Sequence, residues 1–391
     1  MNVLLLTGAP RSSRIRDFLA ARTDRLQECS LPLTLEAARE MAPDFMVIHG
    51  YGPIIKAPVV DAWAGRIINL HNTFLPWGRG LMGNVWSYFE DVPKGVSLHS
   101  VDAGVDTGDV IARRPVSLGL EETLQSSWEV LMDALERMFM EQWEGIAARR
   151  AAPTPQAMLD ALGTHHDRKA GDWLLSLCPQ RWQTPVAHVA ALGREYREDP
   201  AAFAQRCGGE RALPPLPPPT SMPQGKAGVE GEVSVRPATA EDSLINWLWV
   251  NDPVTRAMFK KNHYVGWSEH EQWYGGLLRR QDMFLYIGLA GGRRIGNVRF
   301  DRRAPGTYEI SINMDPRHRG QGLGHRMLAA AIGAFRARAE VSMFFAMAKK
   351  SNPPSIKTFA RLGIHVTAEA SPLAVSRGFD PETEVYMERR L

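Results

Sequence analysis

The sequence predicts an α/β protein with two domains, the first of them built on a parallel sheet that helices cover. Short apolar strands alternate with helical segments in the first third of the chain, and this alternation is typical of such sheets. A proline-rich stretch at residues 213–225 favours an extended, stiff linker over a helix or a central strand. The length of 391 residues leaves room for a domain of ordinary size on each side.

The elements expected in the first domain follow from apolar runs and helical spacing. Strands are expected at residues 3–7, 45–49, 67–70, 95–101 and 110–116. Helices are expected at residues 12–22, 37–41, 83–90 and 121–149. We place the first domain at residues 1–207, with a catalytic core of about residues 1–150, and the linker at residues 208–230.

The second domain, residues 231–391, is expected to begin with a strand at residues 233–236. Thr239 then has the position of a helix N-cap, and Asp242 has the matching position of a capping box. Farther on, an alternating run at residues 308–314 predicts a strand, and an alanine- and leucine-rich run at residues 326–336 predicts a helix.

Two polar side chains lie at the end of the strand expected at residues 67–70. Asn69 and His71 have the same parity, so both can leave the sheet on one face. Open α/β sheets place their ligand sites at this carboxyl end. A V-D-T-G-D motif at residues 105–109 adds the carboxylate of Asp106. The combination suits acyl transfer, because an amide can stabilise an oxyanion and a histidine can move a proton.

These motifs, with the L-P turn at residues 75–76 and the G-V-x-L-H strand, resemble the formyltransferases that use 10-formyltetrahydrofolate. The resemblance covers residues 44–142 and implies a Rossmann-like domain. It assigns catalysis to Asn69, His71 and Asp106, and the H-N-T-F-L-P version of the motif resembles the branch that formylates amino sugars. Arg79 is expected to position either an acidic group or the loop itself. The resemblance also implies that the folate docks around Tyr51, Ile54, Ile55, Val101 and Gly104.

A glycine-rich turn, R-H-R-G-Q-G-L-G-H at residues 317–325, connects the strand and the helix expected in the second domain. Its glycines let backbone N–H groups approach a ligand, and a helix start favours anions. The turn lacks the G-K-[ST] of a kinase P-loop and the spacing of a dinucleotide fingerprint. In this setting it resembles the pyrophosphate loop of the GNAT superfamily of acetyltransferases. The wider similarity covers about residues 233–365 and is to acetyltransferases that act on nucleotide-linked amino sugars.

The GNAT resemblance implies a set of residues that hold acetyl-CoA. They are Met314 on the strand, Arg319, Gln321, Gly322, Leu323 and Gly324 in the turn, and Asn352 farther along. In the family a tyrosine that protonates the departing thiolate follows the asparagine. Phe359 occupies that position here, so the general acid of acetyl transfer is in doubt.

Composition narrows the function classes. A net charge of +3 over 391 residues argues against a dedicated nucleic-acid binder. Three scattered cysteines suit a reducing cytoplasm and give no zinc site, and the histidine pair at residues 165–166 is expected to lie in a polar turn, so no metal is expected. No apolar stretch approaches the length of a membrane span. We expect a cytoplasmic protein without nucleic-acid or membrane partners.

The expected function is that of a bifunctional acyltransferase. It would formylate and acetylate amino groups of a sugar with 10-formyltetrahydrofolate and acetyl-CoA as co-substrates, as the resemblance to the acetyl/formyl transferases of pseudaminic acid synthesis implies. One alternative moves formyl transfer to N-hydroxyornithine for a siderophore. Another makes the GNAT half a binding or regulatory module, which Phe359 supports. The acceptor is expected to be a small-molecule amine, and a homodimer stays open.

Overall fold

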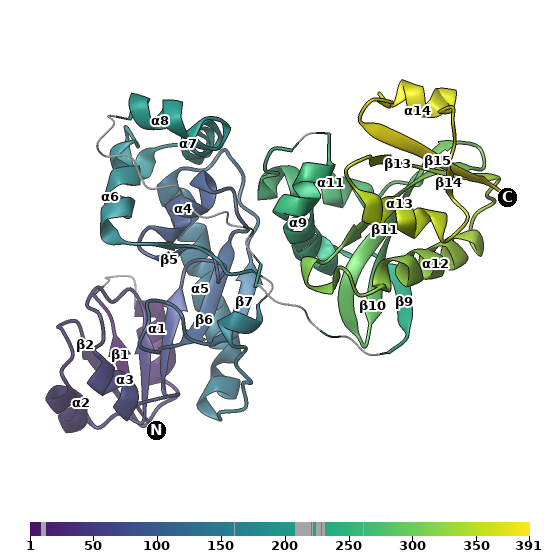
Figure 1. Cartoon of the computed structure of the whole chain (residues 1–391). Coiled ribbons are helices and arrows are strands. Elements are labelled where there is room, and N and C mark those ends of the chain that lie inside the picture. The colour runs from purple at the N-terminus through teal and green to yellow at the C-terminus, as the bar shows by residue number, and fades with distance from the viewer. Residues whose placement is uncertain are drawn as a thin grey trace. The chain divides into compact units, whose positions relative to one another are not determined.

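The computed structural model describes residues 1–8, 13–159, 161–207, 220, 222–223, 228, 231–260 and 262–391. The chain divides into two compact units, Met1–Ser221 and Met222–Leu391 (Figure 1). Most of the linker predicted at residues 208–230 lies outside the described residues, so its conformation stays a prediction. Within the described part, no helix has the length and apolar character needed to cross a membrane.

A six-stranded sheet forms the centre of the first unit. Its strands run in the order β2 (Arg25–Cys29), β1 (Asn2–Leu6), β3 (Phe45–Ile48), β4 (Ile67–His71), β6 (Gly95–Ser100) and β7 (Val110–Pro115). The strands β2, β1, β3 and β4 are parallel to one another, as the sequence predicts. β6 runs antiparallel to both β4 and β7, and its pairing with β4 places His99 directly opposite Asn69 and Ser97 opposite His71.

Alternation along the strands divides the core between the two faces of the sheet. Val3, Leu5 and Val47 pack on one face with α1 (Ser13–Ala20) and α5 (Leu124–Ala147). Leu4, Leu6, Met46 and Ile48 pack on the other face, where α2 (Leu35–Met41) and α3 (Ala57–Ala62) contribute Ala38 and Val59. Successive residues of a strand point to opposite faces, so the apolar runs read from the sequence are buried on both sides.

Sequence patterns missed β2 and α3. β2 is an edge strand of mixed polarity, R-L-Q-E-C, with no buried residue, so its alternation is weak. The long helix α5 begins three residues later than expected, because Thr123 is its N-cap and Ser126 completes the capping box.

The first unit also contains a pair of short strands and a second group of helices outside the six-stranded sheet. The short strands β5 (Arg79–Gly80) and β8 (His165–His166) pair in parallel. A separate apolar cluster gathers side chains of the helices α4 (Gly83–Phe89), α6 (Arg168–Ser176), α7 (Val186–Glu198) and α8 (Pro200–Arg206). Short 3-10 turns lie at Gln156–Met158 and Arg181–Gln183. The pairing of β5 with β8 places residues 165–166 beside Arg79 and Gly80, which follow β4 in the chain.

A seven-stranded sheet forms the second unit. Its order is β14 (His365–Val366), β15 (Glu384–Arg390), β13 (Met343–Lys349), β12 (Thr307–Met314), β11 (Arg293–Ala304), β10 (Met283–Ala290) and β9 (Val233–Pro237). The helices are α9 (Ser243–Asn251), α10 (Pro253–Met258), α11 (Trp267–Leu277), α12 (Leu323–Arg336), α13 (Pro353–Ala360) and α14 (Pro372–Ser376), with 3-10 turns at Ala240–Asp242 and Pro316–His318. The capping box expected at Thr239 and Asp242 is present.

The sheet of the second unit opens between β12 and β13. These two strands are parallel and pair at only three positions, from Thr307 opposite Met343 to Glu309 opposite Phe345. Beyond Glu309, the rest of β12 keeps its pairing with β11 and has left β13. The end of β12 therefore has one edge of backbone that no neighbouring strand in the described sheet pairs.

Candidate functional site

The three residues proposed for catalysis meet at the carboxyl end of β4. Asn69 Nδ2 lies 3.1 Å from Asp106 Oδ1, and His71 Nδ1 lies 3.8 Å from Asp106 Oδ2. Asp106 reaches them from the loop between β6 and β7, where its φ of 54° is left-handed. The Gly80 backbone N–H donates to Asp106 Oδ2 at 3.0 Å. Residues separated by some 35 positions in the sequence thus form one cluster.

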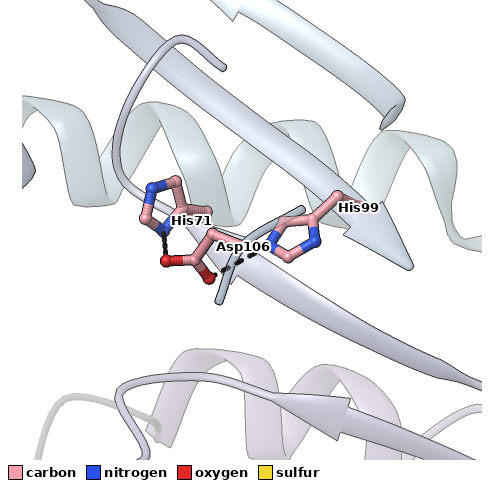
Figure 2. A group of neighbouring side chains, drawn as sticks. All are labelled: His71, His99 and Asp106. Carbon is pink, nitrogen blue, oxygen red and sulfur yellow. Dashed lines mark ion pairs between the residues drawn. The ribbon is translucent and has the colours of Figure 1, made fainter. Parts of the chain in front are cut away.

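His99 is a fourth member of this cluster that sequence reasoning did not assign. Its Nε2 lies 3.5 Å from Asp106 Oδ1 and 3.1 Å from Asn69 Nδ2, and Figure 2 shows Asp106 between the two histidine rings. His99 stands on β6 as the direct cross-strand partner of Asn69. The signal was present in the G-V-x-L-H strand, but only an antiparallel register places that histidine beside Asn69.

Backbone carbonyls fix the tautomers of both histidines. His71 Nε2 lies 3.2 Å from the Gly78 carbonyl oxygen, and His99 Nδ1 lies 2.7 Å from the Ser100 carbonyl oxygen. A carbonyl oxygen can only accept, so these nitrogens carry the hydrogens. In the neutral rings, the lone pairs are then on His71 Nδ1 and His99 Nε2, the two nitrogens that face Asp106.

Burial controls the charges at this cluster. Desolvation lowers the pKa of His71, and the attraction of Asp106 opposes this shift without cancelling it. Burial alone would raise the pKa of the Asp106 carboxyl, but the neighbouring His71 and His99 and the Gly80 N–H hold that pKa well below its usual range. The shift on His71 therefore favours the neutral imidazole, because its ring is largely buried, and the shift on Asp106 favours the ionised carboxylate.

The loop that carries Asp106 is tightly folded, as its glycines predict. A Cβ on Gly104 would lie 2.0 Å from Thr107 Oγ1, and one on Gly108 would lie 1.8 Å from the Ser100 carbonyl oxygen. Gln156 Nε2 donates to the carbonyl oxygens of Asp106 and Gly108 at 2.7 and 2.8 Å. The two hydrogen bonds from Gln156 therefore fix the backbone segment that carries the Asp106 carboxylate.

The residues predicted to hold the folate lie partly together. Tyr51, Ile55 and Val101 pack against one apolar cluster on the face of the sheet that α2 and α3 cover. The Tyr51 hydroxyl donates to the Leu31 carbonyl oxygen at 2.6 Å. Ile54 is 71% exposed, and its side chain contributes little to the core. Gly104 stands in the loop between β6 and β7, which also carries Asp106.

A buried hydrogen-bonded chain supports the carbonyl that holds His71. The Gly78 N–H donates to Thr164 Oγ1 at 3.0 Å, and that hydroxyl donates to Glu90 Oε2 at 2.9 Å. His166 Nε2 lies 2.8 Å from Glu90 Oε1, and its ring stacks on Trp86. His166 is therefore part of a buried cluster and not of an exposed turn.

Arg79, whose role the sequence left open, positions a loop. Its Nη2 donates to the Leu162 carbonyl oxygen at 2.9 Å, and its backbone N–H donates to the Thr164 carbonyl oxygen at 3.0 Å. Segment 162–166 is thus held against the turn that follows β4.

Thr164→Val is expected to lower the turnover number of formyl transfer about tenfold, with little change in KM. The change removes the hydroxyl that fixes the Gly78 segment, so the ring of His71 loses a fixed carbonyl. It also leaves two buried polar groups without that partner, which costs about 1–3 kcal/mol of unfolding free energy each. Thr164→Ser keeps the hydroxyl and should restore the turnover number. Steady-state kinetics of the two variants check this, and equal losses in both would contradict it.

At the second candidate site, the glycine-rich turn leads into α12. Gly320 and Gly322 have φ values of 74° and 71°, a left-handed conformation that glycine adopts without strain. Gly322 is the N-cap residue of α12, and no side chain caps this helix in the described part of the chain. A Cβ on Gly324 would lie 3.6 Å from Met314 Sδ and 3.8 Å from Thr358 Oγ1. The turn therefore lies beside the open end of β12.

The other residues predicted for acetyl-CoA have partners within the domain. Arg319 Nη1 lies 2.7 Å from Asp252 Oδ2, and its Nη2 donates to Thr255 Oγ1 at 2.6 Å. The side chain of Gln321 donates to the Arg317 carbonyl oxygen at 2.9 Å. The remaining members of that set are Leu323, which is buried in the core, and Asn352, whose Oδ1 caps α13 by accepting from the Ser355 N–H.

Phe359 lies in the main apolar core of the second unit and is 2% exposed. The position that carries the tyrosine in the GNAT family is thus filled by a core side chain.

Comparison with known proteins assigns a family to each unit. Residues 18–142 match the formyl transferase family, and residues 242–364 match the acetyltransferase (GNAT) family. The chain is similar to the solved formyltransferase PseJ from Anoxybacillus kamchatkensis, in complex with UDP-4,6-dideoxy-4-formamido-L-AltNAc and tetrahydrofolate. The identity is 34%, and the match covers 48% of this chain and 97% of that chain with a TM-score of 0.45.

Curated relatives include methionyl-tRNA formyltransferases. The methionyl-tRNA formyltransferase of Desulfotalea psychrophila is 32% identical over 113 residues, which are 29% of this chain and 35% of that protein. That of Ralstonia nicotianae is 34% identical over 125 residues, 31% and 38% of the two chains. The chain spans about a third of the length of these relatives. The two family matches occupy separate units, and the chain therefore joins a domain of the formyl transferase family to a domain of the GNAT acetyltransferase family.

Proposed function

We propose that the first domain transfers a formyl group from 10-formyltetrahydrofolate to the amino group of a nucleotide-linked amino sugar. The convergence of Asn69, His71 and Asp106 at the end of β4 carries this proposal. The similarity to PseJ supports the donor and the acceptor class, because that protein was solved with tetrahydrofolate and a formamido sugar nucleotide. The small net charge of +3 also favours a small-molecule acceptor over a nucleic acid.

The arrangement gives each side chain a role in the reaction. The amine nitrogen attacks the formyl carbon, and a negative charge develops on the formyl oxygen. Asn69 Nδ2 exchanges its bond to Asp106 or His99 for one to this oxygen, and such a donor contributes about 3 kcal/mol to acyl transfer. The lone pair of His71 Nδ1 accepts the proton that the amine loses.

Asp106 then acts on the charged form of His71. Its ionised carboxylate stabilises the imidazolium that forms 3.8 Å away. His71 returns the proton to the departing folate nitrogen, which completes the transfer with His71 neutral again. His99 is a positioning residue in this scheme, because it contacts Asn69 and Asp106 and keeps the amide beside the carboxylate.

For the second domain we propose N-acetylation with acetyl-CoA. The gap between β12 and β13 offers backbone to the pantetheine arm, and the turn before α12 offers N–H groups to the pyrophosphate. Phe359 has no hydroxyl and lies in the core, so the thiolate would leave with help from solvent. If no thiolate leaves, the domain is a binding or regulatory module, which is the alternative we retain.

Mass spectrometry of a panel of amino-sugar nucleotides, incubated with the full chain and each donor in turn, tests both activities. We expect a mass increase of one formyl group with the folate donor and of one acetyl group with acetyl-CoA. N-Hydroxyornithine and methionyl-tRNA belong in the same panel. Formylation of either of these in place of every sugar would overturn the assignment of the acceptor.

Gly322→Val is expected to raise the acetyl-CoA dissociation constant tenfold or more, which corresponds to about 1.4 kcal/mol. The side chain would stand between the pyrophosphate and the backbone amides. Valine is also strained at a φ of 71°, so Gly322→Asn is the companion variant, because asparagine tolerates this conformation. Gly333→Ala, on the same helix with open space around it, is the control and should bind normally. Calorimetry that finds equal affinity in all three variants would contradict the assignment.

A further inference from the structure

Three electron-pair donors face one another at the first site. His71 Nδ1, His99 Nε2 and a carboxylate oxygen of Asp106 lie within 4.8 Å of one another (Figure 2). The carbonyl oxygens of Gly78 and Ser100 hold the hydrogens of both rings on the far side. In the neutral rings, the two nitrogens that face the carboxylate carry lone pairs, as the carboxylate oxygens do.

We propose that His71, His99 and Asp106 bind a zinc ion, and that the bound ion stops formyl transfer. Two imidazoles and a carboxylate form a ligand set that zinc takes in open sites, with a fourth position left for water. Both rings also have the outer contact that metal-bound histidines usually have, a hydrogen bond from the distal N–H to a backbone carbonyl. The inhibitory part rests on the function proposed for His71, whereas the binding part does not.

The distances suit zinc after a small closure. Three ligands at about 2 Å from zinc lie roughly 3.3 Å apart in a tetrahedral site. The two nitrogens stand 3.8 and 3.5 Å from oxygens of Asp106, and the widest separation of ligand atoms in the cluster stays within 4.8 Å. The ligands thus have to approach one another by about 1 Å or less per group, an adjustment that side-chain rotation can make.

The orientation of the two rings also favours the ion. A zinc ligand must present a lone pair, and the hydrogen bonds to the Gly78 and Ser100 carbonyl oxygens leave His71 Nδ1 and His99 Nε2 free to do so. Binding of the ion requires Asn69 Nδ2 to give up its bonds to His99 Nε2 and Asp106 Oδ1.

Zinc at this position would occupy the lone pair that His71 needs for the amine proton. It would also bind the Asp106 carboxylate that the proposed reaction uses, and it would turn the Asn69 amide aside. The three effects act together on formyl transfer. They leave the glycine-rich turn of the second domain untouched, since that turn belongs to a separate unit.

Equilibrium dialysis of the full chain against zinc sulfate, with metal content read by mass spectrometry, tests the binding. We expect one ion per chain. His71→Gln and His99→Gln should each raise the zinc dissociation constant at least tenfold. His165→Gln is the matched control, because His165 is an exposed histidine of the same domain outside the cluster, and it should bind as the native chain does. Equal zinc content in all four proteins, or none in the native chain, would overturn the proposal.

Two further readouts separate this inference from the proposed function. Zinc should abolish formyl transfer reversibly on addition of a chelator, while acetyl transfer by the same preparation stays constant. If zinc binds through the two histidines yet formyl transfer continues, the inhibition and the role of His71 both fail. If His71→Gln abolishes formyl transfer but the native chain binds no zinc, only the zinc site fails. Cobalt substitution gives an independent check, because a tetrahedral site produces strong visible absorption that both variants should lose.

Discussion

Formyl transfer by the His71→Gln variant is expected to fall at least about a hundredfold, because glutamine cannot take a proton from the attacking amine near neutral pH. The glutamine amide can still donate to the Gly78 carbonyl oxygen, which lies 3.2 Å from His71 Nε2 in the native chain. The hydrogen bond to Gly78 is thereby kept, so the loss of activity reports the missing proton acceptor and not a change in folding. Initial rates with both donors, measured on one preparation, give the result, and acetyl transfer should not change.

His188→Gln is the control for this experiment. His188 Nε2 lies 3.0 Å from the Leu177 carbonyl oxygen, the same kind of contact in the same domain, but far from Asp106 in the helical part of the fold. Its formylation rate should match that of the native chain. A His71→Gln variant that keeps more than about a tenth of the native rate would remove His71 from the mechanism, since general base catalysis contributes about a hundredfold or more.

The second large effect is expected for Asp106→Asn. Asparagine tolerates the left-handed φ of 54° and can still accept from the Gly80 N–H, so the loop should keep its form. The charge that stabilises the His71 imidazolium is lost, and we expect the formylation rate to fall about a hundredfold. The two variants should not have additive effects, because both act through one ring.

Asp106→Asn should also move the pH profile, and the direction can be derived. His71 must be neutral to act as a base, so the rate falls as the pH drops through the pKa of His71. Burial lowers this pKa, and Asp106 opposes burial more strongly than the hydrogen bond to Gly78 does, so removal of the carboxylate lowers the pKa further. The acid limb of the profile should therefore shift to lower pH. Asp102→Asn changes a carboxylate of the same loop that bonds Gly104 and Thr107, and its profile should keep the native limb.

The sequence predicted the site to the extent that local patterns determine it. An apolar strand ending in Asn69 and His71 places two side chains on one face, and a D-x-G turn supplies Asp106, so these residues could be found without a structure. His99 could not, because its place depends on the antiparallel register of β6 against β4. The lowering of the pKa of His71 could not be predicted either, because the burial of its ring is a property of the whole core.

In the second domain the same division applies. Alternation predicted β12, composition predicted α12, and the glycines predicted the turn between them. The ion pair of Arg319 with Asp252 and its hydrogen bond to Thr255 could not be predicted from the sequence, because α10 and the turn are some 60 residues apart. The burial of Phe359 likewise follows from packing that a motif does not contain.

The hydrogen-bonded chain from Gly78 through Thr164 to Glu90 has a consequence for how this catalytic unit can be inherited. The family match ends at residue 142, and all of Asn69, His71 and Asp106 precede that limit. Thr164, which holds the His71 segment, and Gln156, which holds the Asp106 loop, both follow it. A recombination that exchanged residues 1–150 alone would therefore transfer Asn69, His71 and Asp106 without Thr164 and Gln156, whose hydrogen bonds hold the neighbouring backbone in place. The side chains that support this cluster therefore extend at least through residue 166.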